Sequence, residues 1–229
     1  MIDDPQWVLV WSTMALAIVT FILAFVALFQ DQLRERMRSP RLDVTIEMSP
    51  PDCHMIVVAV SGVTANALYL RLRVWNRGDI PAKDVEVFAA QLRRRDPSQK
   101  WQVAGTFLPM NLLWSHMGKM THLPMLSPGT FKHCDFAHVI DPAKRPTTIE
   151  DNPNLNLTSN QTSMRFDVMV YPNHKGDIVE PGNYELDLVL AGSNCRPTHH
   201  VAVIELTGTW HSNEVHMLGS GVGVTIRRA

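Results

Sequence analysis

The chain has 229 residues, with 21 Lys or Arg and 22 Asp or Glu, so its formal net charge is −1. Hydrophobic residues make up 45% of it and charged residues 19%, which is below the roughly 25% of an average soluble domain. These values exclude a disordered chain, a disulfide-dense miniprotein, a coiled coil and a strongly basic nucleic-acid-binding protein, so we expect no nucleic acid among its partners.

The first predicted element is a transmembrane helix over residues 7–29, a run without a charge, Pro or Gly. At about 1.5 Å per residue the run reaches roughly 34 Å, enough for a hydrocarbon core of about 30 Å. A cleaved signal peptide is disfavoured, because the chain starts with the acidic sequence MIDD. The apolar run also exceeds the roughly 7–15 residues of such a peptide. We therefore expect an uncleaved membrane anchor.

Basic residues beside this span predict its orientation. Residues 1–6 contain no Lys or Arg, whereas the juxtamembrane segment 30–41 contains Arg34, Arg36, Arg38 and Arg41. The positive-inside rule places residues 1–6 outside and the rest of the chain, from residue 30, in the cytoplasm. The same arginines can attract anionic headgroups of the lipid bilayer. Two N-glycosylation sequons, at Asn156 and Asn160, would matter only for an exported domain.

Small side chains follow one stripe of the predicted helix. The stripe consists of Thr13, Ala17, Thr20, Ala24 and Ala27, at alternating spacings of four and three residues. Small residues let two membrane helices approach closely, so the stripe predicts self-association of the transmembrane helix. The alternative is a chance alignment, since Ala and Thr are common in membrane helices.

After residue 41 the hydrophobic pattern changes to period two, which is typical of half-buried strands. Strands are predicted at residues 42–48, 55–60, 68–75, 84–92, 101–107, 131–140, 165–171, 183–191, 199–207 and 221–227. Residues 93–97 are predicted as a polar turn, 108–130 as irregular and 141–163 as a long polar loop. Many short strands without helical patterns between them favour an all-β fold. We expect residues 42–229 to form one antiparallel, immunoglobulin-like two-sheet sandwich.

The segment VWNRGDIPAKDVEV, residues 74–87, resembles the strand–turn–strand of bacterial immunoglobulin-like modules of the CARDB type. The positions that match are Asn76, Gly78, Ala82, Val85 and Val87. A second match is residues 181–186, PGNYEL, which is similar to the opening of a late strand in such modules. The resemblance implies a sandwich fold and no particular function. The chain departs from the family in its length, in residues 108–163 and in its membrane helix.

The sequence contains no motif that specifies a reaction. Three cysteines, at 53, 134 and 195, and ten histidines raise the possibility of a metal site, for example from Cys53, His133 and His200. However, adjacent Cys–His pairs on a strand point to opposite faces, and the chain has no C-x-x-C motif. We expect no catalytic residues, no metal and no cofactor, so the chain is not expected to be an enzyme.

One face of the strand at residues 68–75 is a candidate partner surface. Tyr69, Arg71, Arg73 and Trp75 alternate with core leucines, and aromatic side chains beside Arg are typical of interface hot spots. The alternative is that another layer of the fold covers this face.

The leading hypothesis is a single-pass membrane protein that presents a cytoplasmic sandwich as a binding or scaffolding module for an unidentified protein partner. A second hypothesis is a membrane effector, regulated by a ligand or partner, that acts through transmembrane assembly. An exported adhesion-type sandwich and a metal-dependent enzyme are weaker alternatives.

Overall fold

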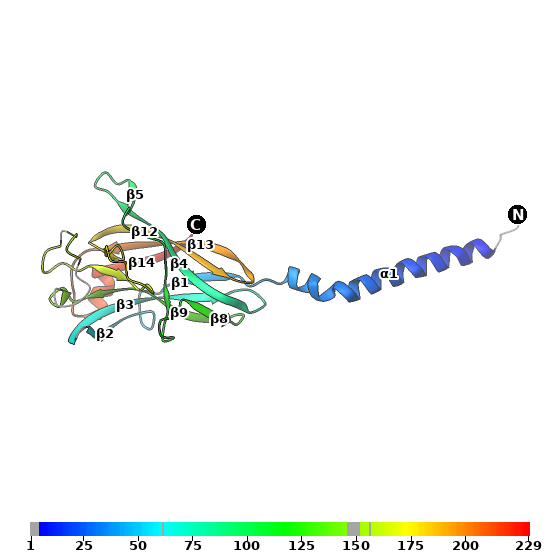
Figure 1. The fold of residues 1–229 in the computed structure, drawn as a ribbon, viewed down its shortest axis with the longest axis horizontal. Coiled ribbons are helices and arrows are strands. Elements are labelled where there is room, and N and C mark those ends of the chain that lie inside the picture. Colours follow the sequence, from blue (N-terminus) through cyan, green and yellow to red (C-terminus); the bar gives the residue numbers. More distant parts are fainter. Residues whose placement is uncertain (1–4, 61, 146–151, 156) are drawn as a thin grey trace. The chain divides into compact units, whose positions relative to one another are not determined.

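The computed structural model describes residues 5–60, 62–145, 152–155 and 157–229. The chain forms two compact units, which divide between Ser39 and Pro40. Figure 1 draws the first unit as a helix and the second as layers of strands.

The first unit is helix α1, Pro5–Met37. Pro5 suits the first helical position, where no intrahelical donor is needed. Within the described residues, the stretch Trp7–Gln30 is the one helical segment long and apolar enough to cross a membrane. The sequence prediction of such a helix is confirmed in length and composition.

The first sheet of the second unit has seven strands, all paired antiparallel. The order along its main path is β1 (Leu42–Thr45), β3 (Val63–Asn76), β9 (Phe131–Ile140), β10 (Met164–Phe166) and β11 (Ile178–Val179). In addition, β2 (Cys53–Val60) pairs with β3, and β7 (Leu113–Trp114) pairs with β9.

The second sheet also has seven antiparallel strands. Its main path runs β14 (Val222–Arg228), β13 (Cys195–Leu206), β12 (Gly182–Gly192), β4 (Ala82–Arg95) and β5 (Trp101–Val103). Two further strands, β6 (Met110–Asn111) and β8 (His122–Leu126), pair with β4. A short helix α2 (Glu214–His216) and a π-helical turn η2 (Met217–Gly221) precede β14. The predicted antiparallel two-sheet sandwich is therefore confirmed.

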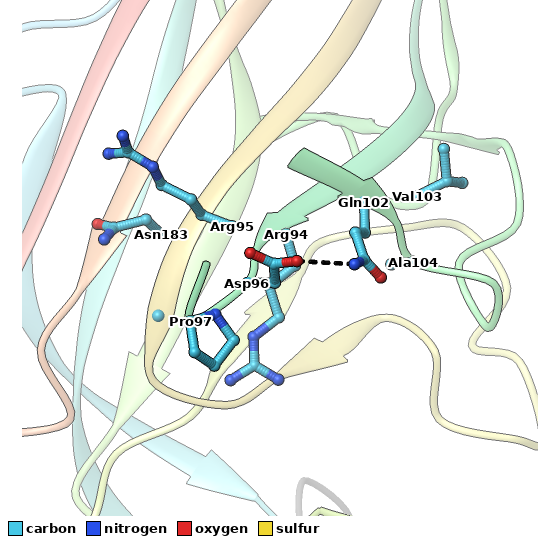
Figure 2. Close-up of a pocket in the computed structure, with 9 residues that line it drawn as sticks. Arg94, Arg95, Asp96, Pro97, Gln102, Val103, Ala104 and Asn183 are labelled. Carbon is cyan, nitrogen blue, oxygen red and sulfur yellow. Dashed lines mark hydrogen bonds between the residues drawn. The ribbon is translucent and has the colours of Figure 1, made fainter. Parts of the chain in front are cut away.

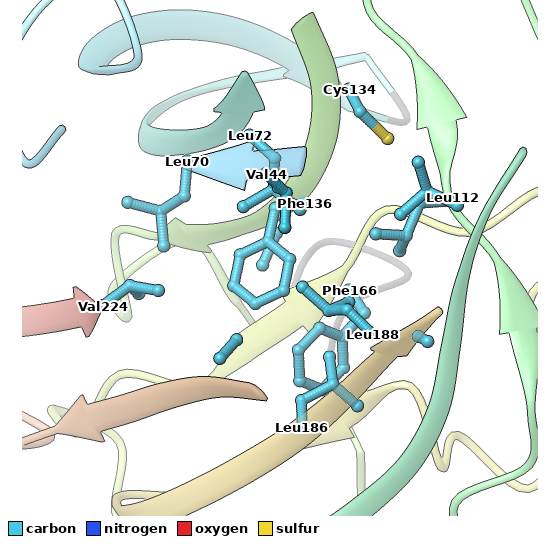
Figure 3. Close-up of a cluster of buried hydrophobic side chains, with 14 of the residues drawn as sticks. Val44, Leu70, Leu72, Leu112, Cys134, Phe136, Phe166, Leu186, Leu188 and Val224 are labelled. Atoms are coloured by element: carbon cyan, nitrogen blue, oxygen red, sulfur yellow. The ribbon is translucent and has the colours of Figure 1, made fainter. Parts of the chain in front are cut away.

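The core lies between the sheets and follows from the alternation in the sequence. In β3, Leu68, Leu70 and Leu72 are fully buried, as are Leu186 and Leu188 in β12. Figure 3 shows Leu70 and Leu72 of one sheet and Leu186 and Leu188 of the other, with the rings of Phe136 and Phe166 among them. The two rings meet edge to face with their centroids 5.7 Å apart. Each buried side chain of this size contributes about 1.5–3 kcal/mol of transfer free energy.

Residues 108–130 are more regular than predicted, because β6, β7 and β8 lie within them. These strands are two to five residues long and pair with β4 or β9, so their conformation depends on distant neighbours. Pro124 lies in β8 at a position that the ladder to β4 skips, as expected for a strand Pro. The sequence prediction also missed β11.

The predicted polar turn at residues 93–97 is wrong in its first half, because β4 continues to Arg95. Arg93 stands opposite Glu185 in the ladder and binds both carboxylate oxygens of Asp187, at 3.0 and 2.6 Å. Opposite charges across neighbouring strands stabilise the pairing, so the charged run extends the strand.

The described part of residues 141–163 contains no strand, in agreement with the predicted loop. Its ends are packed: Arg145 is buried, and its guanidinium donates to the carbonyls of Thr158, at 3.0 Å, and Gln161. Residues 146–151 and 156, and with them Asn156 of the first sequon, lie outside the described residues.

Strand β2 forms an edge of the first sheet, since β3 is its one partner strand among the described residues. The backbone N–H of Met55 points away from β3 and donates to Glu214 Oε2 at 2.6 Å. The carboxylate of Glu214, in α2, therefore accepts a hydrogen bond from a backbone N–H group on this edge.

Candidate functional site

The four residues predicted as a partner surface lie together on the outer face of β3. Tyr69, Arg71, Arg73 and Trp75 are half-buried and alternate with the core residues of that strand. The ladder places Asp135, His133 and Phe131 of β9 opposite Arg71, Arg73 and Trp75, respectively. The face is therefore built by two strands, and sequence analysis had found the residues of one.

Both arginines of this face have carboxylate partners. Arg71 Nε lies 3.1 Å from Asp135 Oδ1, and Ser115 donates to the same oxygen at 2.5 Å. Arg73 Nε donates to Asp52 Oδ1 at 2.8 Å, and its two terminal nitrogens donate to Glu47 at 2.8 and 2.9 Å. These charges are largely compensated within the sandwich, so the face does not attract a partner by net charge.

Asp52, in the connection between β1 and β2, is the centre of this network. Its carboxylate is fully buried. Besides binding Arg73, it lies 3.0 Å from His133 Nε2 and accepts the backbone N–H of Glu47 at 2.9 Å. The residue thus fixes the β1–β2 connection to the outer face of the sheet.

An aromatic column, formed by Arg77, Trp75 and Phe131, continues the face toward the start of β9. The guanidinium carbon of Arg77 lies 3.9 Å from the centroid of the Trp75 ring, and the rings of Trp75 and Phe131 are 4.5 Å apart. Trp75 Nε1 donates to Thr45 Oγ1 at 3.1 Å. The side chain of Phe131 stays 36% exposed, so this column is the accessible apolar part of the predicted surface.

A second polar cluster, which sequence analysis missed, lies along the same sheet at β9 and β10. Arg165 Nε donates to Asp177 Oδ2 at 2.8 Å, with 3% and 0% of their side chains exposed. The Arg165 guanidinium lies 3.4 Å from the centroid of the Tyr171 ring. His138 Nδ1 lies 2.9 Å from Asp167 Oδ1. Within the described part of the chain, the second oxygens of Asp167 and Asp177 are buried without a hydrogen-bond partner, so each carboxylate there has one charged or polar neighbour.

The residues of the metal hypothesis do not converge. The part of the chain that the structure describes contains no cluster of three or more His, Cys, Asp or Glu suited to a metal ion. His133 Nε2 lies within hydrogen-bond distance of Asp52 Oδ1, whereas His200 Nε2 lies 3.9 Å from Asp43 Oδ1.

Burial raises the pKa of Cys53 to about 12 and that of Cys134 well above the ordinary value. These thiols are protonated at neutral pH and are poor nucleophiles and ligands.

His200 makes the stability of the sandwich pH-dependent. Burial lowers its pKa, Arg228 and His199 act in the same direction, and Asp43 opposes them. A histidine with a lowered pKa binds a proton more readily in the unfolded chain, so stability is lost as pH falls below about 6.5. We expect His200→Gln to flatten the unfolding free energy between about pH 7 and pH 5. Urea titrations at several pH values measure this, and an unchanged slope, or an equal effect of the exposed control His199→Gln, contradicts it.

A groove of about 650 Å³ lies between the β4–β5 hairpin and the start of β12 (Figure 2). Its polar groups hold the hairpin together. Asp96 accepts from the Ser98 hydroxyl at 2.7 Å, the backbone N–H of Lys100 at 2.9 Å and Gln102 Nε2 at 2.7 Å. Hydrogen bonds, that of Ser98 first, lower the pKa of Asp96, which suits a structural carboxylate rather than a proton donor.

The membrane features of the sequence lie on α1 and just after it. On the small-residue stripe, the hydroxyls of Thr13 and Thr20 donate to the carbonyls of Leu9 and Leu16, each at 2.8 Å. Both hydroxyls are thus satisfied within the helix. Arg34 and Arg36 lie in α1, but their side chains are outside the described part of the structure. Arg38 and Arg41 are exposed.

The chain enters the sandwich at one end, which we call the tether end: residues 40–43, 77–84, 127–132 and 193–196. Asn76 is buried at its centre, and its side-chain amide uses both acceptor lone pairs and both donor protons. Its Oδ1 accepts the N–H groups of Arg41, at 3.3 Å, and Gly78, at 3.0 Å. Its Nδ2 donates to the carbonyls of Ile80, at 2.8 Å, and Leu126, at 3.0 Å. One amide therefore joins the entering segment to two turns.

No family model, curated protein or solved structure matches this chain. The function is therefore inferred from the residues and geometry given above.

Proposed function

We propose that the protein is a single-pass membrane protein that presents a cytoplasmic β-sandwich as a non-catalytic binding or scaffolding module. The observation that carries this proposal is the joining of one apolar helix, Trp7–Gln30, to a self-contained sandwich unit. Tethering raises the local concentration of a module, so weak contacts with a partner suffice for function. The four arginines between residues 34 and 41 favour the cytoplasmic side for the sandwich.

We further infer that the sandwich is of the bacterial immunoglobulin-like CARDB type. Asn76 is the last residue of β3 and Gly78 lies in the turn that follows, where the family pattern has its strand–turn boundary. Ala82, Val85 and Val87 of β4 are fully buried, so these positions face the core.

Topology is the first test of the proposed function. Reporter fusions at both ends of the full chain, read in intact cells, are expected to place the C-terminus in the cytoplasm. An external C-terminus would overturn the orientation and would favour an exported sandwich, in which Asn160 and the cysteines need a different explanation.

We propose the aromatic column and the adjoining face of β3 as the surface for a protein partner. A photo-crosslinking residue at Phe131 of the membrane-bound chain is expected to capture a protein that the same residue at Val215 does not. Val215 is a suitable control because it is 73% exposed in α2, away from the face. Equal capture at both positions, or at neither, would contradict this assignment.

Self-association through the small-residue stripe gives a further prediction. We expect Ala17→Leu combined with Ala24→Leu to separate the oligomer, because the larger side chains hold the two helix backbones apart. Crosslinking of the full chain in bilayers measures the oligomer. The matched control is Ser12→Leu with Ala15→Leu, which adds similar bulk off the stripe. An oligomer that survives the stripe variant, or is lost equally in the control, contradicts the prediction.

A further inference from the structure

Charge is distributed unevenly over the sandwich. Residues 40–229 contain 18 basic and 18 acidic residues, so this unit has no formal net charge. The tether end contains five basic residues and three acidic ones, so its formal net charge is +2 and that of the remainder of the sandwich is −2. The five basic residues are exposed: Arg41, Arg77, Lys83, Lys132 and Arg196.

Hydrogen bonds hold the segments of the tether end together, so their charges are presented on one end of the sandwich. The N–H of Arg77 donates to the Arg41 carbonyl at 2.7 Å, and the N–H of Gly129 donates to the Asn76 carbonyl at 2.8 Å. On the other sheet, Asn194 Nδ2 donates to the Pro81 carbonyl at 2.9 Å. Figure 1 shows the chain entering the sandwich at the end where these turns lie.

The chain length limits how far this end can lie from the apolar span. Helix α1 continues from Gln30 to Met37, which adds about 11 Å at 1.5 Å per residue. From Met37 to Leu42 the chain reaches at most about 18 Å when fully extended. The basic end is therefore held within roughly 30 Å of the end of the span.

We propose that the tether end docks on the anionic headgroups of the bilayer that α1 spans. This inference rests on the proposed membrane anchoring. Lysines and arginines near an anionic surface each favour the docked state about fivefold. The remainder of the sandwich has a net charge of −2, so on balance the same surface repels it. Arg77 and Phe131 belong to both the tether end and the aromatic column, so docking would bring the column next to the headgroups and would fix the direction in which the outer face of β3 is presented.

The test uses the full chain reconstituted in vesicles, with Cys195→Ser to remove the half-buried thiol of the tether end. A fluorophore is attached at Ser127→Cys, in the tether end, or at Ser212→Cys, which follows the opposite end of β13. Both serines are exposed. Vesicles of phosphatidylcholine alone, or with three-tenths phosphatidylserine, carry a nitroxide headgroup lipid that quenches nearby fluorophores.

We expect quenching at Ser127→Cys in the phosphatidylserine vesicles, with much less in phosphatidylcholine or at high salt. Quenching at Ser212→Cys is expected to stay low throughout. Lys83→Glu with Lys132→Glu is expected to lower the ratio of docked to free sandwich at least about 25-fold. Lys100→Glu with Lys119→Glu makes the same charge change outside the tether end and is expected to leave the quenching unchanged.

Equal quenching in both vesicle types, or equal effects of the two charge-reversal pairs, overturns the docking. Flotation of the chain with vesicles after alkaline extraction separates this result from failure of the proposed function. A chain that floats without headgroup-dependent quenching is anchored but not docked. A chain that does not float is not an integral membrane protein, and both proposals then fail.

Discussion

Asn76→Asp is expected to lower the unfolding free energy of the sandwich by about 3 kcal/mol. The substitution hardly changes the size of the side chain, but it replaces the Nδ2 donor with an oxygen. That oxygen faces the carbonyls of Ile80 and Leu126, which lie 2.8 and 3.0 Å from Nδ2 in the native protein. The carbonyls of Ile80 and Leu126 then lose their donor in a buried site, and a third acceptor oxygen is placed against them. This lowers stability because a buried polar group without a hydrogen-bond partner has lost its hydration and gained nothing in return.

Urea unfolding of the full chain in detergent micelles, followed by tryptophan fluorescence, measures this effect. Asn183→Asp is the matched control, because it makes the same chemical change on an exposed residue at the start of β12. Its effect is expected to stay within about 0.5 kcal/mol. Equal stabilities of the two variants would show that Asn76 does not hold the tether end together.

Breaking the Arg165–Asp177 ion pair is expected to cause a second large loss of unfolding free energy. Arg165→Leu leaves the Asp177 carboxylate fully buried without its ion-pair partner, which costs about 3–5 kcal/mol. The double variant, with Asp177→Leu added, is expected to recover a large part of this loss, because no unpaired charge then remains.

A double-mutant cycle measured by the same urea titrations gives the coupling energy of the pair. The pair Arg227–Glu185, at 2.7 Å, in which the arginine is exposed, provides the comparison. There Arg227→Leu is expected to cost less than about 1 kcal/mol, because Arg93 Nη2 still lies 3.3 Å from Glu185 Oε2 and compensates the remaining charge. A double Arg165–Asp177 variant that is less stable than Arg165→Leu alone would contradict the expected dependence on an unpaired buried charge.

The sequence predicts the long strands well, because burial of one face imposes a period-two pattern on the chain itself. The boundaries of β9 agree with the predicted 131–140, and β3, β4, β12 and β13 each contain most of their predicted segment. The two-residue strands β6, β7 and β11 were missed, since two residues show no period and their pairing depends on distant strands.

The period-two pattern also predicts part of the candidate site. Tyr69, Arg71, Arg73 and Trp75 share one strand, so their common face follows from alternation. The register between β3 and β9 brings Asp135 and Phe131 to this face, and the connection between β1 and β2 brings Asp52 to it. A signal was available for Asn76, because the turn pattern singled it out, but its four hydrogen bonds involve residues up to 50 positions away.

The carboxylate of Glu214 on the edge of β2 has a consequence for the crowded surface of a membrane. Under the proposed anchoring, copies of the protein diffuse in two dimensions and meet often. An apolar edge such as β2, where Val57 is 70% exposed, invites pairing between them. An incoming strand must find the N–H of Met55 available, but Glu214 already accepts it. The negative charge there also repels an identical edge. We therefore expect Glu214 to oppose aggregation through the edge of β2, although its side chain lies outside the hydrophobic core.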